Sequence, residues 1–166
     1  MTTNITKEFE RKFLVRELPQ NLADYQVTTI IQGYLAICEN GTEVRIRKKG
    51  DRYYQTIKSG FGLEREEVEI EINRQQFEIL WAMTKGKRVE KKRYKIQYFH
   101  SIIELDIYSG ILDGLVVAEI EFASLKQAVS FIPPSWFGQE VTEDERYKNR
   151  NLVQYGIPKS LDEDLK

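Results

Sequence analysis

Like charges separated by a single residue recur along this chain, in segments that alternate in the manner of β-strands. The acidic pairs are Glu8 and Glu10, Glu67 and Glu69, Glu104 and Asp106, and Glu119 and Glu121, and the basic pairs are Arg45 and Arg47, and Lys91 and Arg93. Alternate residues of a strand point to the same face, so each pair shares a face while apolar residues occupy the other. Crowded carboxylates raise one another's pKa unless a cation lies among them, and crowded basic groups attract a polyanion. A divalent metal ion together with a phosphate chain would satisfy both sets.

The ordinary explanation for such strands is an open antiparallel sheet whose charged face is in water and carries weak cross-strand ion pairs. For the first strand alone, where Glu8, Glu10 and Lys12 alternate with Phe9 and Phe13, this explanation is the default. Solvated faces usually mix Thr, Ser, Gln and Lys, however, whereas here about eight strands carry a densely ionic face on which acids and bases come as like-charged pairs. We therefore predict that Glu8, Glu10 and Lys12 point inward, toward an enclosed charged interior.

Two amphipathic helices are expected to cover the apolar face of the strands. The first has Asn73 as N-cap with Gln76 as its capping partner and ends at Gly86, and the second begins at Ser124 and is stopped by Pro133. The expected buried residues of the second helix are Leu125, Ala128, Val129 and Ile132. The sequence thus predicts an α+β fold, and if the sheet closes into a barrel with the helices outside, the charged faces line its interior.

Composition favours a single domain over residues 1–166, with 41% hydrophobic and 31% charged residues. The 25 basic and 26 acidic residues nearly balance, so nothing favours binding to nucleic acid or to an anionic membrane. Cys38 and His100 are the only cysteine and histidine, which excludes an internal disulfide and a multi-histidine metal site. We see no apolar signal core or membrane-spanning run and expect a cytoplasmic protein. Whether it forms a homodimer is left open.

The motifs of this chain resemble those of the triphosphate tunnel metalloenzymes, also called the CYTH family. The matching stretches are Glu-x-Glu-x-Lys at residues 8–12, "QGYL", "EVRIR", "TIKS", "REEVEIE", "VEKKRY", "ELD", "AEIEF" and "EVTEDERYKN". The resemblance implies an eight-stranded antiparallel closed barrel, with helices packed outside, that binds a triphosphate and a divalent metal ion in its tunnel. The chain is most similar to short bacterial members, which tend to hydrolyse inorganic triphosphate.

The resemblance also implies roles for individual residues. The phosphate-binding residues would be Lys12, Arg45, Arg47, Lys58, Arg65, Lys91 and Arg93. The ligands of Mg²⁺ or Mn²⁺ would be Glu8, Glu10, Glu104, Asp106, Glu119 and Glu121. Glu67 and Glu69 would be further carboxylates of the catalytic set. The general base is left open between a tunnel carboxylate and Lys91 with a lowered pKa.

The C-terminal residues 140–166 are expected to close one mouth of the tunnel, with a short helix that Thr142 and Glu145 begin in capping-box spacing. The favoured activity is metal-dependent hydrolysis of inorganic triphosphate, or tripolyphosphate, to pyrophosphate and phosphate. Alternatives on the same fold are an adenylate cyclase of class IV type, a thiamine or nucleoside triphosphatase, and a non-catalytic polyphosphate-binding module. No motif announces an adenine pocket, which favours tripolyphosphate over ATP, and Tyr34 is interpreted as a packing residue.

Overall fold

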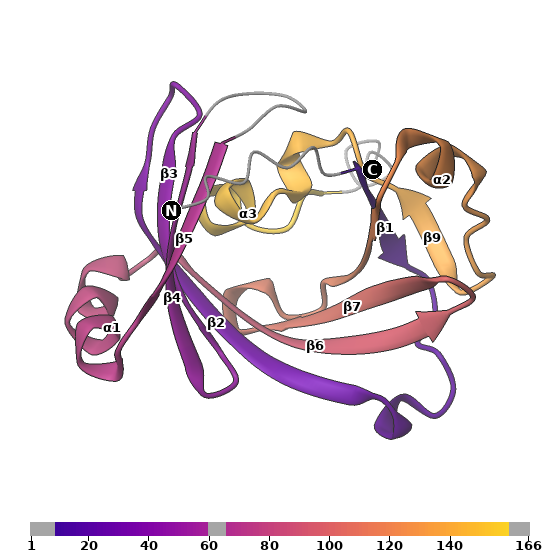
Figure 1. Cartoon of the computed structure of the whole chain (residues 1–166), viewed down its shortest axis with the longest axis horizontal. Helices are drawn as coiled ribbons and strands as arrows, with labels where there is room; N and C mark the ends of the chain where they lie inside the picture. The colour runs from indigo at the N-terminus through magenta and orange to yellow at the C-terminus, as the bar shows by residue number, and fades with distance from the viewer. Residues whose placement is uncertain (1–8, 60–65, 160–166) are drawn as a thin grey trace.

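The computed structural model describes residues 9–59 and 66–159, which form one antiparallel sheet with helices on both faces (Figure 1). The order of the strands across the sheet is β5-β4-β3-β2-β6-β7-β8-β1-β9. The strands are β1 (Phe9–Val15), β2 (Gln26–Ile37), β3 (Glu43–Lys49), β4 (Arg52–Ser59), β5 (Glu66–Ile72), β6 (Arg88–Tyr98), β7 (Ser101–Ser109), β8 (Val116–Phe122) and β9 (Phe137–Glu140). The helices are α1 (Arg74–Trp81), α2 (Leu125–Ser130) and α3 (Asn149–Tyr155), with 3₁₀ turns η1 (Leu22–Asp24), η2 (Ala82–Thr84), η3 (Gly110–Leu112) and η4 (Glu145–Tyr147).

The predicted closed barrel of eight strands is wrong for the described residues, which form an open sheet of nine strands. The edges of this sheet are β5 and β9. The strand β1 pairs with β8 on one side and, on the other, with the short β9, where Val15 lies opposite Phe137. Because β9 occupies the second edge of β1, that edge is not available to β5. The sheet is nevertheless strongly bent, so that β3, β4 and β5 rise on one side of α3 and β1 and β9 on the other (Figure 1).

Two hairpins join strands that adjoin in the chain. The first, at Gly50 and Asp51, joins β3 to β4, with Lys49 opposite Arg52 and Gly50 at φ 59°. Glycine adopts this left-handed conformation without the steric cost that a side chain adds. The second hairpin joins β6 to β7, with Tyr98 opposite Ser101.

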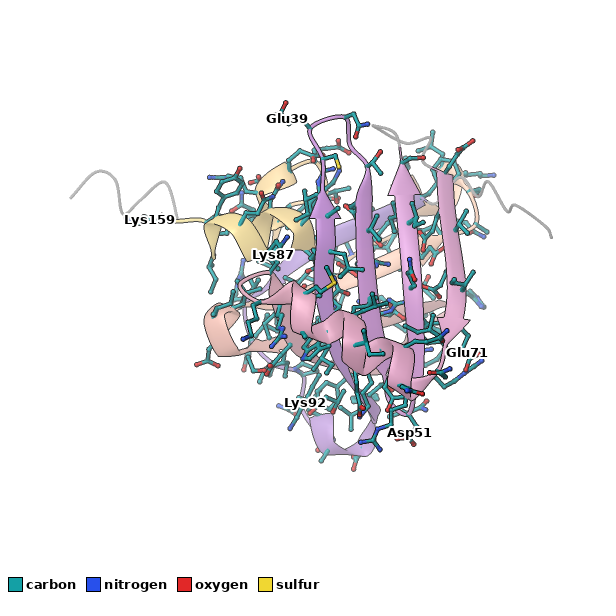
Figure 2. All side chains as sticks on the ribbon, turned by 90° about the vertical axis from the view of Figure 1, so that its left-hand side faces the viewer. Glu39, Asp51, Glu71, Lys87, Lys92 and Lys159 are labelled. Carbon is teal, nitrogen blue, oxygen red and sulfur yellow. The ribbon has the colours of Figure 1, made fainter. Side chains whose placement is uncertain are left out.

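The helix α1 covers the convex face of β3 and β4, as Figure 2 shows in the view onto that side. Its predicted capping box is confirmed, because Asn73 Oδ1 accepts from the Gln76 amide at 2.9 Å and Gln76 Oε1 accepts from the Asn73 amide at 2.9 Å. Phe77 is buried against this face. The helix ends at Trp81, and η2 then packs on β2 so closely that a Cβ on Gly33 would lie 2.5 Å from the Thr84 Cβ. Only glycine fits at position 33.

The helix α2 covers the convex face of β1 and β8 in a different way from the one predicted. Ala128 is buried, but Leu125, Val129 and Ile132 are exposed, so the predicted buried face is wrong for these three residues. The helix has only six residues and cannot present a long apolar stripe. Phe131, just beyond the end of the helix, packs instead against the apolar cluster on this face, which includes Phe13 and Phe122. Arg11 donates to the carbonyl of Phe131 at 3.1 Å.

Residues 141–155, which we call the C-terminal segment, lie on the concave face of the sheet. Leu152 and Val153 pack there against apolar side chains of the strands, namely Tyr34, Val89, Tyr108 and Val117. The predicted start of a helix at Thr142 is wrong, because Asp144 caps η4 by accepting from the Arg146 amide at 3.1 Å. The Thr142 hydroxyl instead accepts from the Lys12 amide at 3.0 Å. No helix in the described ranges is long and apolar enough to cross a membrane.

Candidate active site

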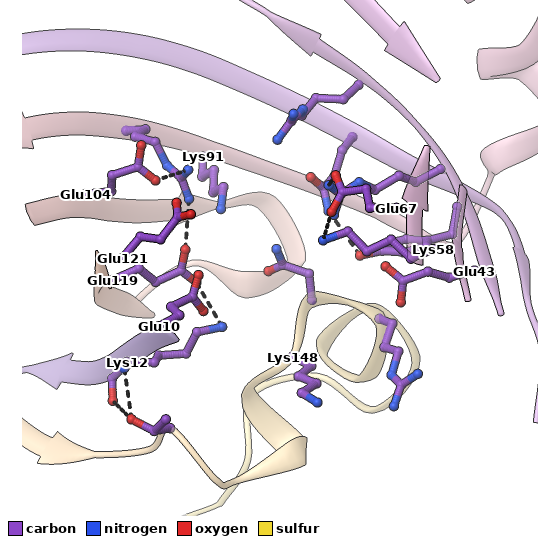
Figure 3. Close-up of a pocket in the computed structure, with 18 of the residues that line it drawn as sticks. Glu10, Lys12, Glu43, Lys58, Glu67, Lys91, Glu104, Glu119, Glu121 and Lys148 are labelled. Atoms are coloured by element: carbon purple, nitrogen blue, oxygen red, sulfur yellow. Dashed lines mark hydrogen bonds and ion pairs between the residues drawn. The ribbon is translucent and has the colours of Figure 1, made fainter. Parts of the chain in front are cut away.

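The concave face and the C-terminal segment together surround a cavity of about 380 Å³ (Figure 3). In the part of the chain that the structure describes, the strands supply six basic residues to its lining, Lys12, Arg45, Arg47, Lys58, Lys91 and Arg93. The same strands supply seven described carboxylates, Glu10, Glu43, Glu67, Glu69, Glu104, Glu119 and Glu121. The cavity is therefore lined by the charged face of the alternating strands, while Phe13 lies in the cluster on the opposite face, beneath α2.

One side of the cavity, which we call the β6–β1 wall, consists of the charged residues of β6, β7, β8 and β1. At its base lies Asp106, whose side chain is fully buried. One oxygen of Asp106 accepts from Lys91 Nζ at 2.5 Å, and each of its two oxygens accepts from the Arg93 guanidinium at 2.7 Å. Arg93 also pairs with Glu104 and, at 3.1 Å, with Glu119. The wall is thus one connected network.

Lys12 extends this network to β1, where its Nζ lies 2.8 Å from Glu119 Oε1. Burial alone would lower the pKa of Lys12, but Glu119 and Glu10 outweigh it, and the pKa is raised. Burial alone would likewise raise the pKa of Glu119, but Lys12, Lys91 and Arg93 outweigh it, and the pKa is lowered. Both groups are therefore held in their charged forms.

Glu10 is the exception on this wall. Its side chain is open to the water of the cavity but is surrounded by protein, and burial together with the charge of Glu119 raises its pKa to about 7 against the opposing effect of Lys12. Glu10 stands opposite Glu121 in the ladder between β1 and β8, and Glu119 stands opposite Glu104 in the ladder between β8 and β7. Three adjacent strands thus concentrate negative charge at one place.

The predicted metal ligands can be checked against the positions of these carboxylates. Within the described residues, no three Asp, Glu, His or Cys side chains are arranged as a ready-made metal site. Mg²⁺ is usually held by one or two carboxylates, water molecules and substrate phosphate oxygens, so two opposed carboxylates such as Glu10 and Glu121 are sufficient donors. The chemistry of the donor set therefore fits Mg²⁺ or Mn²⁺, both of which prefer oxygen ligands.

The opposite side of the cavity, which we call the β3–β5 wall, is built from separate pairs. Arg47 lies 2.9 Å from Glu69, and Lys58 lies 2.7 Å from Glu67. Burial, followed by the repulsion of Arg45, lowers the pKa of Arg47. In the described part of the chain, the buried Nε atoms of Arg45 and Arg47 have no hydrogen-bond partner. These two guanidinium groups keep donor capacity for an anion in the cavity.

The C-terminal segment contributes a third side that the sequence did not assign to the site. Lys148, Asn149 and Arg150 line the cavity, and Figure 3 shows Lys148 between the two walls. Tyr108 donates to Asn149 Oδ1 at 2.8 Å and so fixes the start of α3. The only sequence signal was the match of "EVTEDERYKN" to the resembled family, which indicated a closing element rather than binding groups.

Two polar residues of β2 were also not predicted as lining residues. The Gln32 amide donates to the Tyr34 hydroxyl at 3.1 Å, and both side chains are buried at the cavity surface. Burial raises the pKa of Tyr34 to about 12, so this hydroxyl stays protonated at neutral pH. Tyr34 also packs with the C-terminal segment, which agrees with its interpretation as a packing residue.

The structure brings most of the predicted site residues into this one cavity. Those that line it are Glu10, Lys12, Arg45, Arg47, Lys58, Glu67, Glu69, Lys91, Arg93, Glu104, Glu119 and Glu121. Asp106 lies beneath the lining and contacts Lys91 and Arg93 instead of facing the cavity. Glu8 and Arg65 lie outside the described residues.

The site defines an antiparallel β-protein in which like-charged pairs on the concave strand faces line one partly open cavity. The model of the CYTH domain family matches residues 6–146, and the chain belongs to this family. A protein of Nitrosomonas europaea named inorganic triphosphatase is 47% identical over 147 residues, which are 88% of this chain and 96% of that protein. An inorganic triphosphatase of Acetivibrio thermocellus is 39% identical over 89% of this chain and 94% of its own length. A crystal structure of an inorganic triphosphatase superposes with a TM-score of 0.74 at 43% identity, covering 93% of this chain and 98% of that one.

Proposed function

We propose that this protein hydrolyses inorganic triphosphate to pyrophosphate and phosphate in its cavity, in a reaction that requires Mg²⁺ or Mn²⁺. The observation that carries the proposal is the cavity on the concave face, in which basic and acidic strand residues face one another from two walls. The similarity to proteins named inorganic triphosphatase over most of the chain supports this choice among phosphate-chain substrates.

The basic residues would hold the phosphate oxygens. Arg45 and Arg47 of the β3–β5 wall offer planar guanidinium groups that bind phosphate through two parallel hydrogen bonds, and Lys58 adds a point charge. Lys12 and Arg93 lie on the β6–β1 wall and would contact the chain from the other side. Positive charge on both sides offsets the charge that develops on the leaving phosphate.

Glu10 and Glu121 are the first choice as metal ligands, because they stand opposite each other and face the cavity. Glu119 and Glu104 are the next choice, although each already pairs with Arg93. A metal ion bound there would polarise the scissile phosphoryl group and activate water. Asp106 is better suited to holding Lys91 and Arg93 in place than to binding metal, since both of its oxygens accept from these bases.

Lys91 is the preferred proton acceptor among the candidates. Burial, reinforced by the repulsion of Arg93, lowers its pKa despite the contact with Asp106, and a lowered pKa makes the proton-free amine that a base requires easier to form. The competing carboxylate Glu67 is less suitable. Burial would raise its pKa, but Lys58 and Arg45 lower it, and a carboxylate with a lowered pKa is a weaker base.

A substrate panel tests the proposed function. Tripolyphosphate, pyrophosphate, ATP and thiamine triphosphate are assayed with Mg²⁺ and with Mn²⁺, and released phosphate and cyclic AMP are measured. We expect the highest kcat/KM for tripolyphosphate and no activity in excess chelator. An equal or higher kcat/KM for ATP, or accumulation of cyclic AMP, would overturn the substrate assignment, and full activity in chelator would overturn the metal requirement.

A further inference from the structure

Two basic residues of the cavity come from the C-terminal segment and have no place in the function proposed so far. Lys148 directly precedes α3 and Arg150 is the second residue of that helix, and both side chains line the cavity. The match to the family model ends at residue 146, so neither residue lies within the matched stretch. Figure 3 shows Lys148 between the two walls, which raises the question of which part of a phosphate chain these two lining residues would meet.

The C-terminal segment holds these two residues in a defined position. The Val141 amide donates to the Lys12 carbonyl at 2.8 Å at one end of the segment. Tyr108 donates to Asn149, which lies between the two basic residues, and Leu152 is fully buried one turn later. Because each of these contacts joins the segment to a strand of the sheet, Lys148 and Arg150 are part of the cavity wall.

The charge balance of the cavity indicates that Lys148 and Arg150 matter for binding an anion. Among the described residues, the strands contribute six basic residues and seven carboxylates to the lining, so the formal charge of this part of the strand surface does not favour a polyanion. Most of the strand bases are also engaged by strand carboxylates, as Lys12 is by Glu119 and Arg47 by Glu69. The C-terminal segment adds two cations against a single carboxylate, that of Asp144.

Lys148 and Arg150 share a contact that an anion can displace. Glu145 lies 2.5 Å from Lys148 Nζ and 3.2 Å from the Arg150 guanidinium, and its side chain is 56% exposed. Ion pairs to an exposed carboxylate contribute little to stability, so exchanging Glu145 for a phosphate oxygen costs little.

We propose, on the basis of the function given above, that Lys148 and Arg150 bind one terminal phosphate of the triphosphate chain and make the cavity select triphosphate over pyrophosphate. Three groups of cations then face the cavity, from the β6–β1 wall, the β3–β5 wall and the C-terminal segment. A triphosphate has a phosphate group for each of the three. A pyrophosphate engages the two strand walls and leaves the C-terminal group without a phosphate.

Binding measurements on the full chain test this assignment without depending on turnover. Tripolyphosphate and pyrophosphate are titrated calorimetrically in metal-free buffer containing chelator, against the wild type, Lys148→Met, Arg150→Met and the double variant. Each single substitution should weaken tripolyphosphate binding about tenfold, the value of one charge-assisted hydrogen bond, and weaken pyrophosphate binding about threefold or less. The matched control is Lys126→Met, which removes an exposed lysine from α2 on the convex side and should leave both affinities unchanged.

The outcomes separate this inference from the proposed function. Equal losses for the two anions, or no loss for tripolyphosphate, would overturn the role of the C-terminal cations, and so would a wild type that binds neither anion. A wild type that binds tripolyphosphate but does not hydrolyse it with Mg²⁺ would refute the proposed function and leave the selectivity result standing. Thermal melting checks the fold of each variant, and Lys148→Met decides the question if Arg150→Met melts early, because the Lys148 side chain is the more exposed of the two.

Discussion

The two walls of the cavity carry similar residue types but are built on different principles. On the β6–β1 wall, Asp106 is completely buried and forms ion pairs with both Lys91 and Arg93. Arg93 also forms ion pairs with two further carboxylates. On the β3–β5 wall, Glu67 and Glu69 pair with neighbouring bases, and their side chains are 29% and 31% exposed. Removing one member of a buried network leaves an uncompensated charge, whereas exposed pairs are screened by water. The first wall should therefore determine stability, and the second should act mainly on binding.

The largest effect is expected from Asp106→Asn, which keeps the size of the side chain but leaves Lys91 and Arg93 without their shared buried carboxylate. We expect a loss of about 3–5 kcal/mol in the free energy of unfolding, measured by urea denaturation at pH 7. The matched variant on the other wall is Glu69→Gln, which removes the partner of Arg47 and should cost less than about 1 kcal/mol. Similar losses for the two variants would show that the walls do not differ in this way.

The faces of the strands could be predicted from the sequence, but the closure of the sheet could not. Period-two alternation alone places Arg45 and Arg47 on the cavity face and Ile46 on the other, and the structure has them there. Whether a sheet closes depends on which edges meet, and the edge of β1 is taken by β9. The sequence of β9, "FGQE", has four residues without clear alternation, too few to announce a strand.

The C-terminal side of the cavity was missed for a related reason. The interior face was predicted to be lined by the charged residues, yet Val89 and Val117 also stand on it, two positions before Lys91 and Glu119 on the same strands. These apolar positions are where Leu152 and Val153 pack. Such a contact joins residues far apart in the chain, and local periodicity does not indicate which distant segment covers an apolar patch.

Glu10→Gln and Glu121→Gln should each lower kcat with Mg²⁺ at least about 100-fold, because each removes a charged metal ligand with little change in volume. Phosphate release from tripolyphosphate is the measurement, and thermal melting verifies the fold. Both residues lie on the β6–β1 wall, so the expected loss of turnover is assigned to this wall. Undiminished turnover of both variants would remove the metal assignment from these two residues.

Arg47→Met on the β3–β5 wall should raise KM for tripolyphosphate about tenfold, since one charge-assisted contact to phosphate is lost. Its effect on stability should be small, because its partner Glu69 remains partly exposed and hydrogen-bonded to Thr56 at 2.8 Å. The matched control is Arg52→Met, on the strand β4, whose exposed pair with Glu71 lies outside the cavity lining. Steady-state kinetics make the comparison. If both variants raise KM equally, the effect comes from the lower overall positive charge and not from a contact in the cavity.

The smallest expected effect concerns pH and sharpens the description of the β6–β1 wall. The pKa of Glu10 is raised to about 7 in the folded protein, so the folded state binds this proton more tightly than the unfolded chain does. The resulting stability is fully present below the unfolded pKa of about 4.5 and is lost as the pH rises through about 7. Glu119 does not mask the effect, because its lowered pKa keeps it ionised in both states above pH 6.

Glu10→Gln carries no titrating proton and resembles the protonated wild type. In metal-free buffer, its unfolding free energy should exceed that of the wild type only slightly at pH 5, just above the unfolded pKa, and by about 1 kcal/mol at pH 8.5. This is less than full conversion of the pKa shift because Glu10 is open to cavity water. Urea denaturation at both pH values measures the difference, and Glu69→Gln on the other wall serves as the comparison. If the two variants follow the wild type in parallel across this range, burial and the charge of Glu119 do not raise the pKa of Glu10 in the folded protein, and the β6–β1 wall is already balanced without a metal ion.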